Sequence, residues 1–241
     1  MLTPDVAPLP VPAYREAARR HRKSRANGRC GAGPFTRRSA PMIPASRQLS
    51  LPFGLLALVW LWAAIEPLSR SDWLLENLLV FFFGGLLLAT RRRFAFSLGA
   101  YWLFALFLAL HLYGSHYTYA ETPLGDWLRD TFGLRRNSYD RLVHCAFGLL
   151  LTCPLRELLE RRAGLHGLWL DGLALCLVMA MSGLYEQLEM LATLIVSPEL
   201  GTAFLGTQGD EWDAQKDSGL ATLGALAALG LRRLSSRRGP T

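Results

Sequence analysis

Long runs of apolar residues with almost no charge constrain this chain more than any other feature. Residues 51–65, 78–89, 94–112 and 173–181 form four such runs. A helix on the surface of a soluble protein carries a polar face every few residues, and these runs lack one. Lipid is therefore the solvent that we expect around them, and the sequence predicts an all-α polytopic membrane protein.

Six segments approach the length and apolarity of a spanning helix, which needs about 20 residues to cross roughly 30 Å of hydrocarbon. We expect a bundle of about six transmembrane helices, at residues 49–66, 73–90, 94–113, 138–156, 168–196 and 218–234. The last segment is rich in Ala and Gly, so we expect it to pack inside the bundle, because small residues let helices approach closely. The fifth is long enough to tilt, or to extend past the membrane as far as Pro198.

Basic residues predict the orientation of this bundle, because cytoplasmic loops hold the excess of Lys and Arg. After residue 41, eleven basic residues fall in one alternating set of loops and six in the other. This asymmetry predicts that both termini are cytoplasmic. The acidic residues are distributed the other way, with three on the inner side and fourteen at or near the outer face.

The net charge of +7 lies in one segment. Residues 1–41 hold nine Lys or Arg and two acidic residues, whereas the rest of the chain has seventeen of each. Because this basic segment has no apolar periodicity, we expect a disordered extension that either binds anionic lipid headgroups or is dispensable. An incorrectly assigned start is the other interpretation, since Met42 precedes the first helix. The transmembrane domain then covers residues 42–235, and residues 236–241 form a cytoplasmic tail.

Two loops on the expected outer face are rich in residues that carry out chemistry, one between the third and fourth helices and one at residues 206–217. At the start of the fourth helix, which Asn137 or Ser138 can cap, Asp140 and His144 lie one turn apart on a single face. Such a pair can bind one metal ion, or the carboxylate can orient the imidazole. Asp213 and Asp217 repeat this spacing before the last helix.

Glu186 lies inside the fifth apolar segment, ten residues before its end, so we expect it below the lipid headgroups. An ionisable side chain there costs roughly 2.5–3.5 kcal/mol on insertion scales and needs a partner or an aqueous cavity. The candidate partners are His144, Arg141, Lys216 or a bound cation. Carboxylates combined with imidazole suit Zn, Mn or Fe better than copper, although no fixed zinc motif such as HExxH is present.

From these patterns we predict a site that binds a divalent metal, Zn or Mn, at the outer face. The predicted metal ligands are Asp140, His144, Glu186, Asp213 and Asp217. The predicted catalytic acid or base is His116 or Glu121. The predicted substrate-binding residues are Arg141, Tyr117, Tyr119, Glu189, Gln208, Asp210 and Lys216, of which Arg141 and Lys216 would meet an anionic headgroup.

Each of these features also has a purely structural interpretation. Asp140 and His144 can form an ordinary interhelical hydrogen bond, and Asp213 with Asp217 can cap a helix, because acids favour helix N-termini. The aromatic residues of the outer loops are typical interfacial anchors. They are Tyr113, Tyr117, Tyr119, Trp127 and Trp212.

Five stretches of the chain carry a family resemblance: HxYGxHYTYAETPLG at 111–125, RNSYDRLVH at 136–144, PLRE at 154–157, LYEQLE at 184–189 and FLGTQGDEWDAQKD at 204–217. In these stretches the chain resembles the YjdF-like family of uncharacterised bacterial inner-membrane proteins, from about residue 49 to 234. Ser115 stands where a small residue, commonly Ala, is expected. The resemblance implies a multi-pass inner-membrane location and six helices, and it implies no activity.

Three classes of function therefore stay open. The first is an enzyme that hydrolyses or transfers a polar group on a lipid, the second a proton- or cation-coupled transporter, and the third an envelope accessory protein that docks a protein partner. We expect membrane lipids as partners and no nucleic acid, because the folded part of the chain has no net charge.

Overall fold

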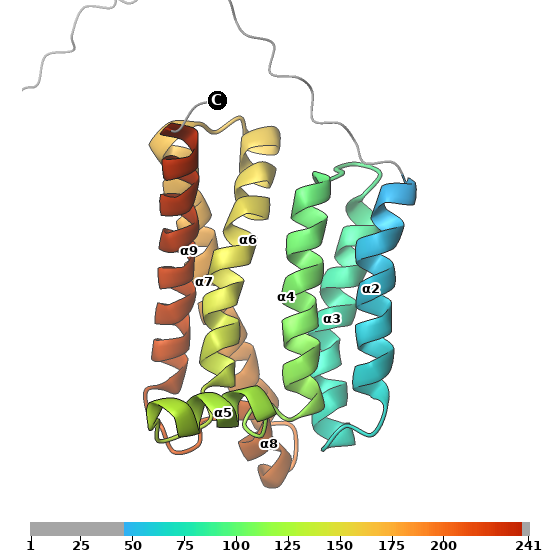
Figure 1. Ribbon diagram of the computed structural model, residues 1–241, viewed down its shortest axis with the longest axis vertical. Coiled ribbons are helices and arrows are strands. Elements are labelled where there is room, and N and C mark those ends of the chain that lie inside the picture. Colours follow the sequence, from blue (N-terminus) through green and yellow to red (C-terminus); the bar gives the residue numbers. More distant parts are fainter. Residues whose placement is uncertain (1–45, 238–241) are drawn as a thin grey trace, which may run out of the picture. The chain divides into compact units, whose positions relative to one another are not determined.

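The computed structural model describes residues 46–237. The expected basic extension at residues 1–41 lies outside the described residues, and so do residues 238–241 of the expected tail. Between these limits the chain forms eight α-helices and no strand, which confirms the expected all-α class for this part (Figure 1). The helices are α2 (Ser46–Ala64), α3 (Arg70–Thr90), α4 (Leu98–His116), α5 (Pro123–Phe132), α6 (Tyr139–Ala163), α7 (Gly167–Thr193), α8 (Pro198–Leu205) and α9 (Asp213–Arg237).

Six long helices correspond to the six predicted segments. Four of them, α3, α4, α6 and α7, are long and apolar enough to cross a membrane. Helix α2 is apolar over residues 48–64 but shorter, and α9 is not among the candidate spans. Helix α7 ends at Thr193 rather than continuing to residue 196, and Ser197 then caps α8 by accepting a hydrogen bond from the backbone N–H of Leu200.

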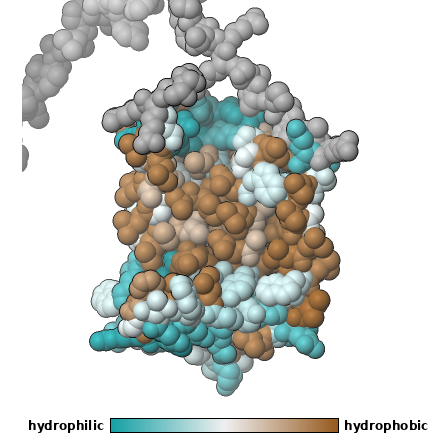
Figure 2. All heavy atoms as spheres, viewed as in Figure 1, coloured by the Kyte–Doolittle hydropathy of each residue, from teal (hydrophilic) through white to brown (hydrophobic). Residues whose placement is uncertain are grey.

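Apolar side chains form a band around the middle of the long helices, between two hydrophilic ends (Figure 2). Large side chains such as Leu58, Phe82 and Leu231 are exposed in this band. Contiguous exposed apolar surface of this kind is rare on soluble monomers and is normal against lipid. Exposed tryptophans lie toward the ends, as in an interfacial belt: Trp102, Trp127, Trp169 and Trp212.

The two ends of the bundle differ in structure. At one end, here called the α5/α8 end, α5 lies across the axes of the long helices (Figure 1). Its ends are well defined, because Thr122 caps its start before Pro123 and Gly133 takes the left-handed conformation that ends it. The opposite, arginine-rich end holds an ion-pair network in which Asp171 accepts hydrogen bonds from Arg156 and Arg233.

The long helices form two groups, α2–α3–α4 and α6–α7–α9, which pack together along α4 and α6. Helices α6 and α9 are packed most closely: a Cβ added at Gly148 would lie 1.8 Å from the Ala221 carbonyl oxygen, and one added at Gly224 would lie 2.1 Å from that of Cys145. The small residues of α9 thus face the bundle, as the sequence predicts, while Leu223 and other leucines of its opposite face are exposed.

Candidate functional site

The five predicted metal ligands converge at the α5/α8 end of α6, α7 and α9. We call Asp140, His144, Glu186, Asp213 and Asp217 the acid–histidine cluster. One carboxylate oxygen from each of Asp140, Asp213 and Asp217 lies within 4.8 Å of the other two. His144 Nε2 lies 3.3 Å from Glu186 Oε1 and 3.6 Å from Asp140 Oδ1, and its Nδ1 lies 3.4 Å from the Ser182 hydroxyl. The side chains can therefore share an ion or a water.

The start of α6 sets the position of Asp140 and His144. Ser138 occupies the N-cap position but its side chain makes no capping bond. Instead, Asn137 Oδ1 accepts a hydrogen bond from the Tyr139 N–H at 3.1 Å, and the same side chain donates to the Thr122 carbonyl oxygen at 2.9 Å. Asn137 thus fixes the first turn of α6 against the start of α5, so that Asp140 faces α9 and His144 faces α7.

Two buried carboxylate oxygens of the cluster have no hydrogen-bond partner among the described residues. They are Oδ1 of Asp217, a residue that is 1% exposed, and Oε1 of Glu186, which lies 3.3 Å from His144 Nε2 without the geometry of a hydrogen bond. Leaving a buried polar group unsatisfied costs about 1–3 kcal/mol, and more for a charge. An additional ligand inside the cluster would remove this cost.

The charges around the cluster do not balance when every group is ionised. The carboxylates of the cluster and of Asp210 number five, whereas the basic groups that contact them, Arg136, Arg141 and Lys216, number three. Two negative charges remain in a buried site. One divalent cation would neutralise them.

Arg136 is the residue that attaches the 206–212 loop to the start of α6. Its side chain, 7% exposed, pairs with Asp213 Oδ1 and donates hydrogen bonds to the backbone carbonyl oxygens of Thr207 at 2.8 Å and Gly206 at 3.1 Å. Arg141 also contacts Asp213 Oδ1, at 3.2 Å. Because both arginines contact this oxygen, a cation would bind Asp213 through its other oxygen.

Four predicted substrate-binding residues, Arg141, Gln208, Asp210 and Lys216, contact one another or other residues of the site. Lys216 and Arg141 both pair with Asp210, and Gln208 exchanges two hydrogen bonds with the backbone of Asn137. The Lys216 ammonium, with the Arg141 guanidinium, lowers the pKa of Asp210 to about 2. Neither Arg141 nor Lys216 lines the cavity described below, so the structure does not place them against a ligand in that cavity.

The Asp210 pairs should stabilise the protein above about pH 4 and cease to do so in acid. The folded pKa lies below the ordinary value of 3.8, so the contribution is complete above 3.8 and is lost as the pH falls through about 2. We expect Asp210→Asn to lower the thermal unfolding midpoint at pH 7, and the difference from wild type to shrink between pH 4 and pH 2. Glu211→Gln, at an exposed neighbouring position, is the control. A difference that is independent of pH would contradict this assignment.

A cavity of about 340 Å³ lies beside the acid–histidine cluster, bordered by α3, α4, α6, α7 and the end of α8. Most of its lining is apolar. Asp140, His144 and Glu189 reach it from α6 and α7, and Glu189 was among the predicted substrate-binding residues. Of the acid–histidine cluster, Asp140 and His144 line this space, which is large enough for a small ligand, whereas Glu186, Asp213 and Asp217 do not line it.

A second polar group lines the cavity opposite the cluster, formed by Tyr119, His111 and Glu76. The Tyr119 hydroxyl lies 2.6 Å from His111 Nδ1, and His111 Nε2 lies 3.0 Å from the Glu76 carbonyl oxygen and 3.7 Å from its carboxylate. The Tyr185 hydroxyl donates to Glu76 Oε2 at 3.3 Å. When Nε2 carries the proton of the neutral ring, it donates to the Glu76 carbonyl oxygen, and Nδ1 accepts a hydrogen bond from the Tyr119 hydroxyl. The phenol is then hydrogen-bonded to a base that the Glu76 carbonyl orients.

Tyr119 points inward because Gly114 leaves room for it. A Cβ at Gly114 would lie 2.7 Å from the Tyr119 ring. Tyr119 is 9% exposed, which differs from the interfacial position that an anchor would take, whereas Trp127 and Trp212 are exposed as anchors are. Burial and the nearby Glu76 carboxylate raise the pKa of the Tyr119 phenol.

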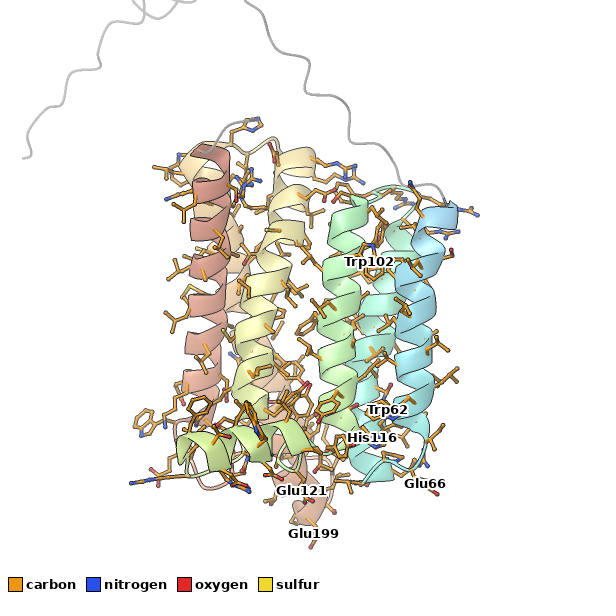
Figure 3. The ribbon with its side chains drawn as sticks, in the orientation of Figure 1. Trp62, Glu66, Trp102, His116, Glu121 and Glu199 are labelled. Atoms are coloured by element: carbon orange, nitrogen blue, oxygen red, sulfur yellow. The ribbon has the colours of Figure 1, made fainter. Side chains whose placement is uncertain are left out.

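The two predicted acid–base residues, His116 and Glu121, do not line the cavity. His116 stacks on Trp62 at 4.6 Å between ring centroids, and its Nδ1 lies 3.1 Å from the Ala63 carbonyl oxygen (Figure 3). Glu121 is exposed in the loop before α5. Tyr117 packs against Trp62, His116 and Tyr113. The structure therefore brings none of these three to the cluster.

Sequence reasoning missed Glu76 and Tyr185 as site residues and mentioned His111 only within a motif. A signal for Glu76 was present: Asp72 and Glu76 lie one turn apart at the start of the second predicted segment, and both are buried. The same argument that singled out Glu186, the cost of an ionisable group in lipid, applies to Glu76.

An apolar helical bundle with buried carboxylates and histidines at one end defines a polytopic membrane protein with a buried polar site. The chain belongs to the DUF2238 family of predicted membrane proteins, whose model matches residues 49–238. It is similar to inner membrane protein YjdF of Escherichia coli (strain K12), with 35% identity over 196 residues, covering 81% of this chain and 91% of that protein. No solved structure matches it significantly. The expected family and inner-membrane location are thereby confirmed.

Proposed function

We propose that this protein is a divalent-metal-dependent enzyme that hydrolyses or transfers a polar group on a membrane lipid. The observation that carries the proposal is the convergence of three carboxylates, from Asp140, Asp213 and Asp217, within 4.8 Å of one another in a buried site. The unpartnered Asp217 Oδ1 supports a cation there, and so does the excess of two negative charges that results when every carboxylate is ionised. Carboxylate oxygens are ligands for both Zn and Mn.

The proposed topology has six spans and both termini in the cytoplasm. Helices α2 and α9 complete the four candidate spans, and the exposed leucines of α9 support lipid contact for that helix. The arginine-rich end then faces the cytoplasm, because basic residues are retained on that side. The acid–histidine cluster consequently lies beneath the outer surface of the inner membrane.

The proposed chemistry uses the two sides of the cavity. A divalent cation held by Asp140, Asp213 and Asp217 would make a water acidic enough to ionise near neutral pH. His144, which Glu186 contacts at 3.3 Å, would take the proton of that water as the water oxygen bonds to the electrophilic centre of the lipid. Tyr119 would give its proton to the leaving oxygen as the bond to that oxygen breaks, and the release of the proton from His144 and the uptake of one by Tyr119 would return both groups to their starting states.

Transport fits the structure less well than catalysis, because the polar residues do not continue across the bundle. On α6, residues 145–155 between His144 and Arg156 include no carboxylate, imidazole or basic side chain. Twelve residues of helix correspond to about 18 Å. The facing part of α7, residues 172–181, is equally apolar. A proton or cation path needs ionisable steps in this region.

Metal analysis of the purified full chain tests the proposal. We expect one equivalent of Zn or Mn per chain, and Asp217→Asn or Glu186→Gln should weaken metal binding by at least the roughly 10- to 100-fold that loss of an outer-shell partner causes. Glu211→Gln is the matched control, because Glu211 is exposed in the adjoining loop. Vesicles of phosphatidylglycerol supply the probe for activity, measured as release of a water-soluble phosphate or glycerol product.

The outcomes separate clearly. Stoichiometric metal that Glu211→Gln retains and the two site variants lose supports the site, and product release that depends on this metal supports the enzyme. Protein that stays metal-free after incubation with Zn and Mn, and whose thermal stability is the same before and after that incubation, rules the proposal out.

A further inference from the structure

The ionisable residues that line the cavity lie at one level, and the lining deeper in the bundle is apolar apart from Ser182. Along α3 the lining residues progress from Glu76 through Leu79 and Phe82 to Leu86, and on α4 from His111 to Phe107. On α6 they progress from Asp140 and His144 to Phe147, and on α7 from Glu189 to Met181. In every helix the polar residue lies toward the α5/α8 end and the apolar residue toward the middle of the bundle. The cavity thus has the polarity gradient of a lipid.

The depth of the cavity matches one leaflet. Ten residues of α3 separate Glu76 from Leu86, which corresponds to about 15 Å. The hydrocarbon of a bilayer is about 30 Å thick, so the apolar part of the cavity spans about half of it. A lipid of the leaflet at the α5/α8 end can therefore occupy the cavity at its normal depth, without leaving the hydrocarbon region.

The cavity opens sideways between α3 and α7. These helices meet through the Tyr185–Glu76 hydrogen bond but do not pack closely. The lining residues Phe82 and Leu86 on α3, and Leu184 and Leu188 on α7, are also exposed on the outside of the bundle. In a membrane this opening faces lipid tails rather than water.

We infer that this cavity, here called the tail cavity, holds one hydrocarbon tail of a bilayer lipid that enters between α3 and α7. The inference deepens the proposed function and rests on it for the headgroup, which lies between the acid–histidine cluster and Tyr119. The substrate class is then a lipid whose reacting bond lies next to a tail, at the level of the ester or phosphate groups. The tail itself is recognised by shape and apolarity, with Phe107 and Phe147 as its inner walls.

Photolabelling in vesicles tests this inference with the full chain. The protein is reconstituted into phosphatidylethanolamine and phosphatidylglycerol containing a trace of phosphatidylglycerol with a photoreactive diazirine in mid-tail. We expect the label on Phe107, which is 7% exposed and lines the cavity, as well as on outward-facing residues. Labelling confined to outward-facing residues such as Leu191 would overturn the inference.

Two exposed leucines of α7 provide matched variants. Leu184→Trp places a bulky side chain at the mouth, and Leu191→Trp places one at a position that does not line the cavity; the native leucines are 56% and 48% exposed. Because both positions are exposed, both variants should fold. We expect Leu184→Trp to reduce labelling of Phe107 about tenfold by excluding the tail, and Leu191→Trp to leave it unchanged. Equal labelling in the two variants contradicts a tail entering at this mouth.

Metal content measured on the same samples separates this inference from the proposed function. Label on Phe107 in a protein that binds no metal would support a lipid tail in the tail cavity and contradict the metal-dependent enzyme. Bound metal without label on Phe107 would support the metal site and contradict the lipid tail.

Discussion

Gly148→Leu and Gly224→Leu should each prevent α6 and α9 from packing and should leave little folded protein. Each glycine faces a backbone carbonyl of the other helix, at 1.8 Å and 2.1 Å from the position of an added Cβ. A backbone atom cannot rotate away as a side chain can, so the helices must separate. We expect a loss of at least about 3 kcal/mol, the upper end of the usual cost of overpacking. Size-exclusion chromatography of detergent extracts after graded heating measures it.

Gly230→Leu is the control on the same helix, because nothing lies within 4 Å of a Cβ at that exposed position. It should behave as wild type or be slightly more stable, since glycine weakens a helix. If Gly224→Leu were as stable as Gly230→Leu, the close approach of α6 and α9 would be wrong. The positions of Asp213 and Asp217 relative to Asp140 would then be wrong as well, since α9 carries both.

Arg136→Ala should destabilise the protein by about 3–5 kcal/mol, the typical cost of removing one partner of a buried ion pair. The substitution leaves the Asp213 carboxylate with the contact to Arg141 at 3.2 Å, and it frees the carbonyl oxygen of Gly206, whereas that of Thr207 keeps the Asp210 N–H. Thermal unfolding in detergent measures the loss. Metal binding should weaken too, because the 206–212 loop that leads into α9 loses one of its attachments to the start of α6.

The adjacent Arg135 gives the comparison for this substitution. It is exposed, and Arg135→Ala should change stability by no more than about 0.5 kcal/mol, as surface substitutions usually do. Similar losses for the two variants would indicate a general effect of charge at this end of the bundle, and would contradict a specific role of Arg136.

The sequence alone predicted the long helices well, because apolar runs and helix length are local properties. Its predicted ends were less accurate. The third segment was expected from residue 94, and α4 begins at Leu98, because Ser97 accepts a hydrogen bond from the Ala100 N–H and caps it. The short helices α5 and α8 were not predicted, since 10 and 8 residues fall far below the length of a span.

The convergence of Asp140, His144, Glu186, Asp213 and Asp217 could be predicted, because residues one turn apart share a helix face and all five were expected at one membrane side. The inward orientation of Tyr119 could not, since it depends on a contact with Gly114 that the loop creates only once folded. The partners of Arg141 and Lys216 could not be predicted either. Their charge suggested that they bind an anionic ligand, whereas both form ion pairs with Asp210, which the 206–212 loop brings close to them.

The mouth between α3 and α7 has a kinetic consequence. Under the proposed function, a lipid that enters there would arrive by lateral diffusion within its leaflet, so the rate would follow the mole fraction of that lipid in the bilayer and not its amount per volume of water. Diluting the vesicles should leave the turnover unchanged, whereas diluting the substrate lipid with an inert one should slow it in proportion. The exposed leucines at this mouth would thus make membrane composition the variable that sets the rate.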